Sequence, residues 1–184
     1  MKENMLGKKI GMLQIFDKTG EVVGVTAIEV GPCIVTQIKT VEKDGYSAVQ
    51  LSLGKKKREF EISNPAEYKV GQELKVDVFK AGDELKISGT TIGKGFAGRI
   101  KRWHSHRGPM SHGSKFHRIM GSIGSGSTPG RVWKGKPMPG RMGNVKVTLK
   151  NVQIVDVLPE KNLLLIKGSV PGKRGNLVLL RKNA

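Results

Sequence analysis

The chain has 184 residues, a formal net charge of +18 at pH 7 and a pI of about 10.2. This length suits one domain with one hydrophobic core, and the basic surplus predicts a polyanionic partner. We do not expect a membrane-inserted or secreted protein, because we find no long apolar span, clean amphipathic helix or N-terminal signal-peptide stretch. The single cysteine, Cys33, excludes an intramolecular disulfide framework, suits a reducing cytoplasm and is expected to be buried on a strand.

The first part of the chain predicts short β-strands separated by turn residues. Residues 21–30 are rich in Val, Ile and Thr and predict a strand that ends at Gly31-Pro32. Residues 33–40 alternate in polarity, and residues 46–53 place Val, Leu and Leu on one face. The Asp44-Gly45 turn between these two segments predicts a β-hairpin.

A short basic run, residues 54–58, follows this hairpin. It is interpreted either as a solvated loop or as a phosphate contact, and the sequence leaves both open. Residues 74–79 then alternate in polarity, and Ala81-Gly82-Asp83 turns the chain into residues 84–91. This pattern predicts a second hairpin.

The C-terminal part of the chain predicts three more strands, at residues 145–157, 163–167 and 177–180. The apolar residues change parity near Lys150-Asn151, which predicts a β-bulge in the first of these strands. Short strands, tight turns and the absence of a long helical period together indicate an all-β barrel or sandwich.

One short helix is predicted around residues 96–103. Phe96, Ile100 and Trp103 fall at positions i, i+4 and i+7, so we expect them to be buried against the barrel. Arg99 and Arg102 are then expected to face outward.

The segment 93–144 differs from the rest of the chain in charge and composition. It holds eleven Lys and Arg residues, no acid, both tryptophans and all four histidines. Twelve glycines and four prolines break any helical or strand period. Its large apolar residues are too few to offset the entropy of ordering its backbone, so an outside partner is expected to order it. With no acid present, that partner should be a polyanion.

Two glycine-rich motifs in this segment suggest a nucleotide-binding enzyme, but neither is complete. Gly93 to Gly98 matches GxGxxG, yet the next acid is Asp156 and no strand–helix–strand unit follows. Residues 130–137 resemble a P-loop, but Pro137 occupies the position of the magnesium-binding hydroxyl. A nucleotide-binding enzyme therefore remains only an alternative, as does a free RNA chaperone or DNA-binding protein.

The four histidines (His104, His106, His112 and His117) do not predict a metal site or a catalytic site. They lie among cations, and no cysteine or carboxylate is near them in the sequence to ligate zinc or to orient an imidazole. Histidine, arginine and tryptophan together suit stacking on RNA bases and bridging of phosphates. We expect no catalytic residue, no metal, no cofactor and no small-molecule substrate.

Seven motifs in series resemble bacterial members of the ribosomal protein L3 family, and they cover nearly the whole chain. They are GKKIGM (7–12), GPC (31–33), GKGFAG with KRW (93–103), SHGSKFHR (111–118), GSIG (121–124), TPGRVWKGKPMPGRMGN (128–144) and NLLLIKGSVPG (162–172).

The resemblance implies a translation-factor-like β-barrel formed by residues 1–92 and 145–184, with at most one or two short helices. It also implies that residues 93–144 form a long irregular extension that penetrates the ribosomal RNA of the large subunit. The implied function is structural: direct RNA binding, early assembly and support of the peptidyl transferase centre in the cytoplasmic ribosome. The implied partners are large-subunit ribosomal RNA and neighbouring large-subunit proteins.

The expected RNA-binding residues follow from the basic segment and from this resemblance. They are Lys8, Lys9, Lys94, Arg99, Lys101, Arg102, Trp103, His104, His106, Arg107, His112, Lys115, His117, Arg118, Arg131, Trp133, Lys134, Lys136 and Arg141. The residues expected at the extension tip, nearest the peptidyl transferase centre, are Pro137, Met138, Pro139, Gly140, Arg141, Met142 and Gly143.

The chain departs from the family pattern in two places. Bacterial members usually carry a longer, partly helical basic segment where only residues 54–58 remain, which puts the peripheral contacts of that segment in doubt. Some relatives have a methylated glutamine where this chain has Arg141, so that modification cannot occur at this position.

Overall fold

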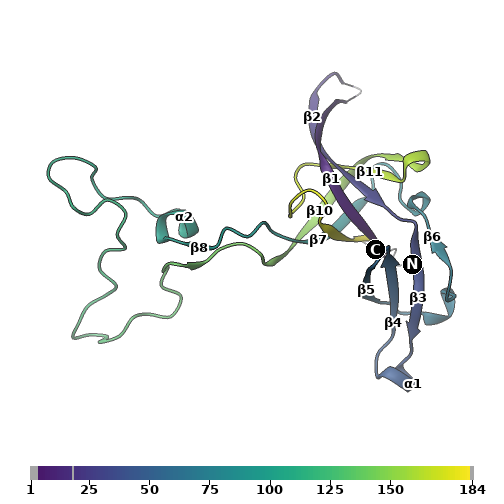
Figure 1. Cartoon of the computed structure of the whole chain (residues 1–184), viewed down its shortest axis with the longest axis horizontal. Helices are drawn as coiled ribbons and strands as arrows, with labels where there is room; N and C mark the ends of the chain where they lie inside the picture. The colour runs from purple at the N-terminus through teal and green to yellow at the C-terminus, as the bar shows by residue number, and fades with distance from the viewer. Residues whose placement is uncertain (1–3, 18, 183–184) are drawn as a thin grey trace. The chain divides into compact units, whose positions relative to one another are not determined.

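The computed structural model describes residues 4–17 and 19–182, and its regular elements are mostly β-strands (Figure 1). By their internal contacts the residues divide into two compact units. The first comprises residues 1–91 and 145–184, and the second comprises residues 92–144.

The first unit is built on a closed antiparallel barrel of six strands. Around the ring the order is β1 (Asn4–Phe16), β12 (Leu177–Lys182), β7 (Glu84–Thr90), β10 (Lys146–Leu158), β11 (Leu163–Lys167) and β2 (Val22–Val30). Closure pairs every strand on both sides, so the ring has no free edge. The predicted all-β barrel is confirmed.

Alternation along the strands explains the barrel core. Leu85 and Ile87 of β7, and Val178 and Leu180 of β12, are fully buried, while the residues between them are more exposed. Successive side chains of a strand point to opposite faces, so one apolar row fills the interior. Each such side chain contributes about 1.5–3 kcal/mol when it is fully buried.

Irregular pairing in β10 matches the predicted bulge. Its register against β7 shifts between Leu149 and Val152, and Asn151 has φ +54°. An extra residue on one strand bends it and lets the apolar residues on both sides of the bulge face the same core.

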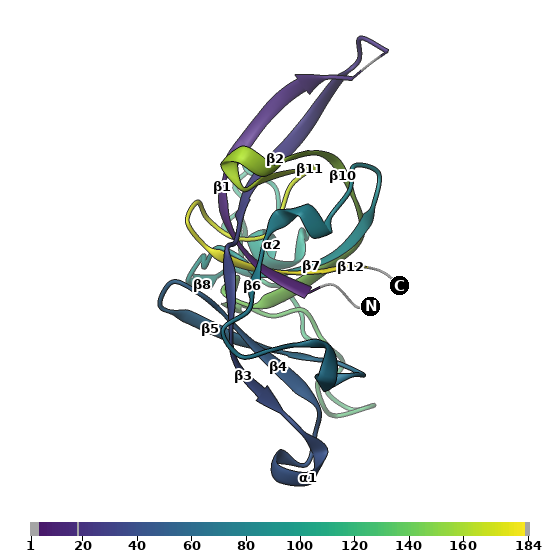
Figure 2. The same cartoon turned by 90° about the vertical axis from the view of Figure 1, so that its right-hand side faces the viewer.

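A four-stranded sheet packs its inner face onto the barrel core, in the order β5-β4-β3-β6. Its strands are β3 (Cys33–Lys39), β4 (Ala48–Leu53), β5 (Lys56–Glu61) and β6 (Glu73–Leu74). Its largest fully buried side chain is Phe60 of β5, which joins the same apolar cluster as the barrel residues. Figure 2 shows this sheet beside the ring, with the hairpin end of β1 and β2 extending beyond the barrel.

The predicted first hairpin is confirmed, since β3 and β4 pair antiparallel, but its connection differs from a simple turn. A single helical turn, α1 (Val41–Asp44), precedes Gly45, which adopts φ +81° and donates its N–H to Val41 O at 3.0 Å. Glycine suits this left-handed position because it has no Cβ.

Two sequence predictions in this unit are wrong. The solvated loop, one of two interpretations of residues 54–58, is not found: a turn leads there into β5, which pairs with β4 along its whole length. The predicted second hairpin does not form, because Val76–Val78 is a 3₁₀ turn (η2) and β7 pairs with β10 and β12 instead. The turn buries Val76 and Phe79 in the core, which the alternation pattern could not distinguish from a strand. Further 3₁₀ turns are η1 (Pro65–Glu67) and η3 (Pro159–Lys161).

Cys33 is fully buried, as the sequence predicts, and its Sγ lies 3.4 Å from Leu6 O. Burial raises the pKa of the Cys33 thiol, because desolvation disfavours the thiolate. This cysteine is therefore a core residue and not a nucleophile.

The second unit has little regular structure. It contains two short strands, β8 (Phe96–Ala97) and β9 (Gly140–Arg141), and one short helix, α2 (Arg99–Trp103). The chain between α2 and β9 is irregular (Figure 1). Throughout residues 92–144, all of which the structure describes, only Ala97 is buried.

Candidate nucleic-acid interface

The basic unit is closed by a short antiparallel ladder between its first and last residues. Phe96 pairs with Arg141, and Ala97 pairs with Gly140. Next to these pairs, Lys94 N donates to Met142 O and Met142 N donates to Gly95 O, each at 2.9 Å. Residues 140–142, which belong to the segment predicted as the tip of the extension, therefore lie beside residues 94–97 near the start of the unit.

Two glycines permit close approaches of the backbone within the unit. Gly143 has φ +72°, and a Cβ at this position would collide with the carbonyl of Ile92. A Cβ on Gly108 would collide with the carbonyl of Phe116, next to the hydrogen bond from Gly108 N to His117 O at 3.0 Å. Glycine is the residue that allows such contacts.

The arginines of α2 hold the unit together by binding backbone carbonyls. Arg99 Nη1 donates to Met120 O at 2.6 Å, and Arg102 Nη1 donates to Met138 O at 3.0 Å. Trp103 Nε1 donates to the same Met138 oxygen at 2.9 Å. Hydrogen bonds from a charged donor are the stronger kind, so these contacts compensate in part for the missing core.

The predicted burial of Phe96 and Trp103 is wrong, whereas Ile100 is half-buried. Phe96 and Trp103 are 81% and 47% exposed, whereas Arg99 and Arg102 are half-buried. The physical reason is that this unit offers carbonyl acceptors for guanidinium groups but no apolar core for the aromatic side chains. Arg99 Nε is buried and has no hydrogen-bond acceptor among the described residues.

Many large apolar side chains of the unit are exposed to solvent. They are Ile92, Phe96, Trp103, Met110, Phe116, Ile119, Ile123 and Trp133. Two of them carry a cation over the ring: Arg102 lies 5.1 Å from the Trp103 centroid, and Arg131 lies 5.0 Å from the Trp133 centroid. Exposed aromatic rings are suited to stack on nucleic-acid bases, and the adjacent guanidinium groups are suited to pair with phosphates.

Most cations predicted to bind RNA are solvent-exposed within this unit. They are Lys94, Lys101, Arg107, Lys115, Arg118, Arg131, Lys134 and Arg141, with Lys136 half-buried. Since residues 92–144 contain no acid, none of these side chains can be neutralised inside the unit. The unit thus presents a surface of one sign of charge.

The histidines lie apart from any metal-binding arrangement. His104 caps α2 with φ +54°, His112 has φ +56°, and His106 is exposed. His117 Nδ1 lies 3.0 Å from Pro109 O, a distance at which a protonated Nδ1 donates to this carbonyl. The described residues contain no cluster of three or more His, Cys, Asp or Glu side chains suited to a metal.

The two lysines predicted to bind RNA from the first unit differ in their surroundings. Lys8 is exposed, and its Nζ lies 3.9 Å from Glu29 Oε2. Lys9 Nζ donates to Val170 O at 2.6 Å and to Gly172 O at 3.1 Å. The ammonium of Lys9 thus fastens the loop before β12 to β1, a structural role that the sequence did not indicate.

Comparison with known protein families matches residues 13–162 to the family Ribosomal protein L3. This range covers most of the chain and the whole basic unit. The chain belongs to the ribosomal protein L3 family. Members are structural proteins of the large ribosomal subunit, and the family is not an enzyme family. The predicted family is confirmed, although the match starts after the GKKIGM motif at residues 7–12.

The L3 family associates with large-subunit ribosomal RNA and with other ribosomal proteins. Gly93 to Gly98, which suggested a nucleotide-binding loop, instead pairs with residues 140–142 and leads into the five-residue α2. Among the helices described, none has the length and apolar character to cross a membrane.

Proposed function

We propose that residues 92–144 of this L3 family protein bind large-subunit ribosomal RNA directly and take their final structure from it. The observation that carries this proposal is the combination of eleven cations, no acid and a single buried residue, Ala97, in one unit. A protein segment with exposed aromatic rings and unneutralised cations is stabilised when phosphates and bases surround it.

The side chains divide into two groups with different tasks. Arg99, Arg102 and Trp103 shape the unit through bonds to Met120 O and Met138 O. The exposed cations and Trp133 remain available for the ligand: the cations for phosphate oxygens and the indole for a base.

As a structural constituent, the protein would nucleate assembly of the large subunit and support its RNA. Early binding would fix the RNA fold around residues 93–144, and the barrel residues 1–92 and 145–184 would contact neighbouring large-subunit proteins. In this proposal residues 137–143 lie near the peptidyl transferase centre and hold the RNA there in shape. Pro137 and Pro139 stiffen this segment, and Arg141 is its only charged side chain.

Salt dependence of binding tests the central part of this proposal. The full chain is titrated with a transcript of large-subunit ribosomal RNA between 50 and 200 mM salt. Neutralisation of six to ten phosphates predicts a loss of affinity of about 10³–10⁵ over this range. A log–log slope of about −2 would mean that the basic unit hardly contacts phosphate, and the proposal would fail.

Substitution of Arg141 tests the placement of residues 137–143. Arg141→Ala should leave barrel stability and incorporation into subunits intact, because the side chain is exposed. It should change the reactivity of peptidyl-transferase-centre nucleotides to chemical probes. Lys101→Ala, another exposed cation of the same unit, is the matched control. Identical probing of both variants and the wild type would contradict this placement.

A further inference from the structure

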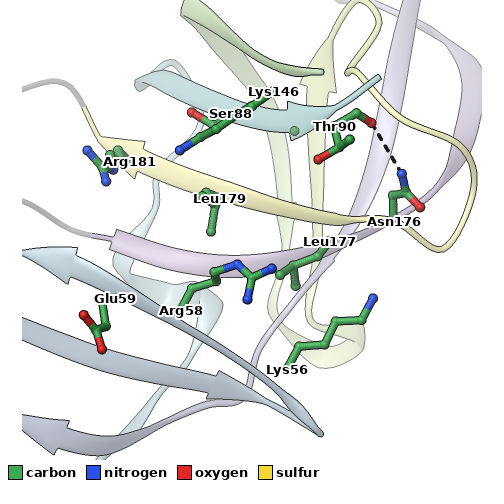
Figure 3. A pocket seen from close by; sticks show the side chains of 11 residues that line it. Lys56, Arg58, Glu59, Ser88, Thr90, Lys146, Asn176, Leu177, Leu179 and Arg181 are labelled. Atoms are coloured by element: carbon green, nitrogen blue, oxygen red, sulfur yellow. Dashed lines mark hydrogen bonds between the residues drawn. The ribbon is translucent and has the colours of Figure 1, made fainter. Parts of the chain in front are cut away.

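A cleft on the first unit, lined only by residues outside the basic unit, has the chemistry of a second phosphate site. Its volume is about 410 Å³, and its walls come from β5, β7, β10 and β12 (Figure 3). Its charged and polar lining includes Lys56, Arg58, Ser88, Lys146, Asn176 and Arg181. We propose that this cleft binds the sugar-phosphate backbone of an RNA strand.

Strand geometry places cations from β5 and β12 at the cleft. On β5, Lys56 and Arg58 have the parity of Phe60, which is fully buried, so they lie on the face turned toward the barrel. On β12, Arg181 has the parity opposite to Leu180, which fills the barrel interior, so it lies on the outer face of the ring. Arg181 links the two walls, because its guanidinium lies 5.5 Å from the Phe60 ring centroid.

Residues of β7 and β10 complete the lining. Thr90 pairs with Lys146, which brings a fourth cation to the rim. Ser88 Oγ lies 2.8 Å from Thr148 Oγ1, and Asn176 Nδ2 donates to Thr90 O at 3.4 Å. Hydroxyl and amide groups at this place could bind phosphate or ribose oxygens.

The charge of the cleft is not balanced by the protein. The residues described show no ion pair for Lys56, Arg58, Lys146 or Arg181. The only acid in the lining, Glu59, is bound elsewhere: its carboxylate accepts from Tyr46 Oη at 2.9 Å and lies 3.2 Å from Lys39 Nζ. These partners lower the pKa of Glu59, so it stays ionised and committed to them.

The arrangement fits an extended anion better than a single small one. The four cations come from three strands and line an open cleft, whereas a site for one phosphate gathers its donors around one point. Leu177 and Leu179 form an apolar part of the lining, against which a ribose can pack. An acidic protein segment would meet the same charges, but in an RNA-binding protein the available polyanion is RNA. This inference rests on the proposed function and extends it to the barrel.

The test compares two fourfold variants of the full chain. The first neutralises the cleft: Lys56→Gln, Arg58→Gln, Lys146→Gln and Arg181→Gln. The second removes the same charge from exposed lysines outside the cleft: Lys43→Gln, Lys69→Gln, Lys75→Gln and Lys161→Gln. Both are titrated with the same ribosomal RNA transcript over a salt series, and the protected nucleotides are mapped by hydroxyl-radical footprinting. Thermal unfolding verifies that each variant is folded.

The cleft variant should lose about tenfold or more in affinity, and its salt slope should become shallower by about 3. It should also lose one group of protected nucleotides while the protection produced by residues 92–144 remains. The control should retain that protection and most of the affinity. If the cleft variant destabilises the barrel, the double variant Lys56→Gln/Arg58→Gln on the edge strand replaces it, with the same expected loss of protection.

Three outcomes would overturn the inference. If the wild type itself does not bind the transcript, the proposed function and the inference both fail. If the wild type binds and the cleft variant keeps every protected nucleotide, the inference alone fails. If RNA binding is unchanged but the cleft variant no longer binds a neighbouring ribosomal protein, the occupant of the cleft is protein and not RNA.

Discussion

The two units of this protein obtain their stability in different ways. The barrel unit buries a continuous apolar cluster that includes Phe60, Ile87, Leu164 and Leu180, and it contains all fifteen acids of the chain beside 22 basic residues. Residues 92–144 bury only Ala97, contain no acid and leave both tryptophans exposed. The barrel unit thus has a hydrophobic core of its own, whereas residues 92–144 have no such core and carry eleven cations without an acid. Variants that alter either the barrel unit or residues 92–144 can separate their contributions to stability and to RNA binding.

Removal of the basic unit should have the largest effect. It should weaken RNA binding and leave the stability of the barrel unchanged. Thr91 N donates to Val145 O at 3.0 Å, so β7 and β10 end side by side and a short turn can join them. Replacement of residues 95–143 by such a turn should lower RNA affinity by about a thousandfold or more. The midpoint of thermal unfolding should stay within a few degrees. Loss of the cooperative transition would show that the barrel depends on the unit.

Truncation of one aromatic residue from each unit should separate stability from binding. Phe60→Ala leaves a cavity in the core and should lower the free energy of unfolding by about 3–5 kcal/mol. Trp133→Ala removes a side chain that is 59% exposed, so the free energy of unfolding should change by less than about 0.5 kcal/mol. RNA affinity should instead weaken by about 1–3 kcal/mol for one lost base stack. Chemical denaturation and RNA titration of both variants measure the two effects, and equal destabilisation would contradict the contrast.

Lys9 is charged, but we expect it to stabilise the barrel rather than to bind RNA. Lys9→Met removes the donor for Val170 O and Gly172 O and should lower the free energy of unfolding by about 1–3 kcal/mol. Lys8→Met, the exposed neighbour, should change it by less than about 0.5 kcal/mol. Urea denaturation of both variants gives the comparison. A larger effect of Lys9→Met on RNA affinity than on stability would assign Lys9 to the interface instead.

The smallest predicted effect is a loss of stability when the ion pair between Asp83 and Lys182 is broken. Lys182 Nζ lies 2.8 Å from Asp83 Oδ2. Lys182 and the N–H of Lys80 lower the pKa of Asp83 below its usual value of 3.8. A lowered pKa in the folded state adds stability above pH 4, and this stability is lost as the pH falls through the folded-state value. Asp83→Asn should therefore cost about 0.5–1 kcal/mol at pH 7. The difference from the wild type should vanish in acid, and an unchanged difference at pH 2 would contradict the pair's role.

Much of the barrel could be predicted because its signals are local. The parity change near Lys150-Asn151 correctly predicted a bulge in β10, and the turn residues located most strand ends. Local patterns do not encode which distant strands pair, so the contacts of β7 with β10 and β12 were missed. Residues 74–79 fit a strand pattern but form a 3₁₀ turn, since only the tertiary core selects between these states.

The candidate interface was predicted by composition, whereas its internal geometry was not. Absence of acids and excess of Gly, Pro and cations identify residues 93–144 without any structure. The spacing of Phe96, Ile100 and Trp103 was misleading, because helical periodicity predicts a buried face only where a core exists to cover it. Arg99 and Arg102 bond to carbonyls 21 and 36 residues away, and the cleft cations come from separate strands. Such contacts follow from the fold and leave no local signal.

Hydrogen exchange of the full chain, free and bound to a large-subunit ribosomal RNA transcript, tests the central claim most directly. Amides of the barrel strands should be protected in both states, because their hydrogen bonds belong to a closed ring around a buried core. Amides of residues 92–144 should exchange rapidly in the free protein and become protected when RNA is bound. Strong protection of residues 92–144 without RNA, or rapid exchange in the complex, would contradict the claim that this unit obtains its structure from RNA.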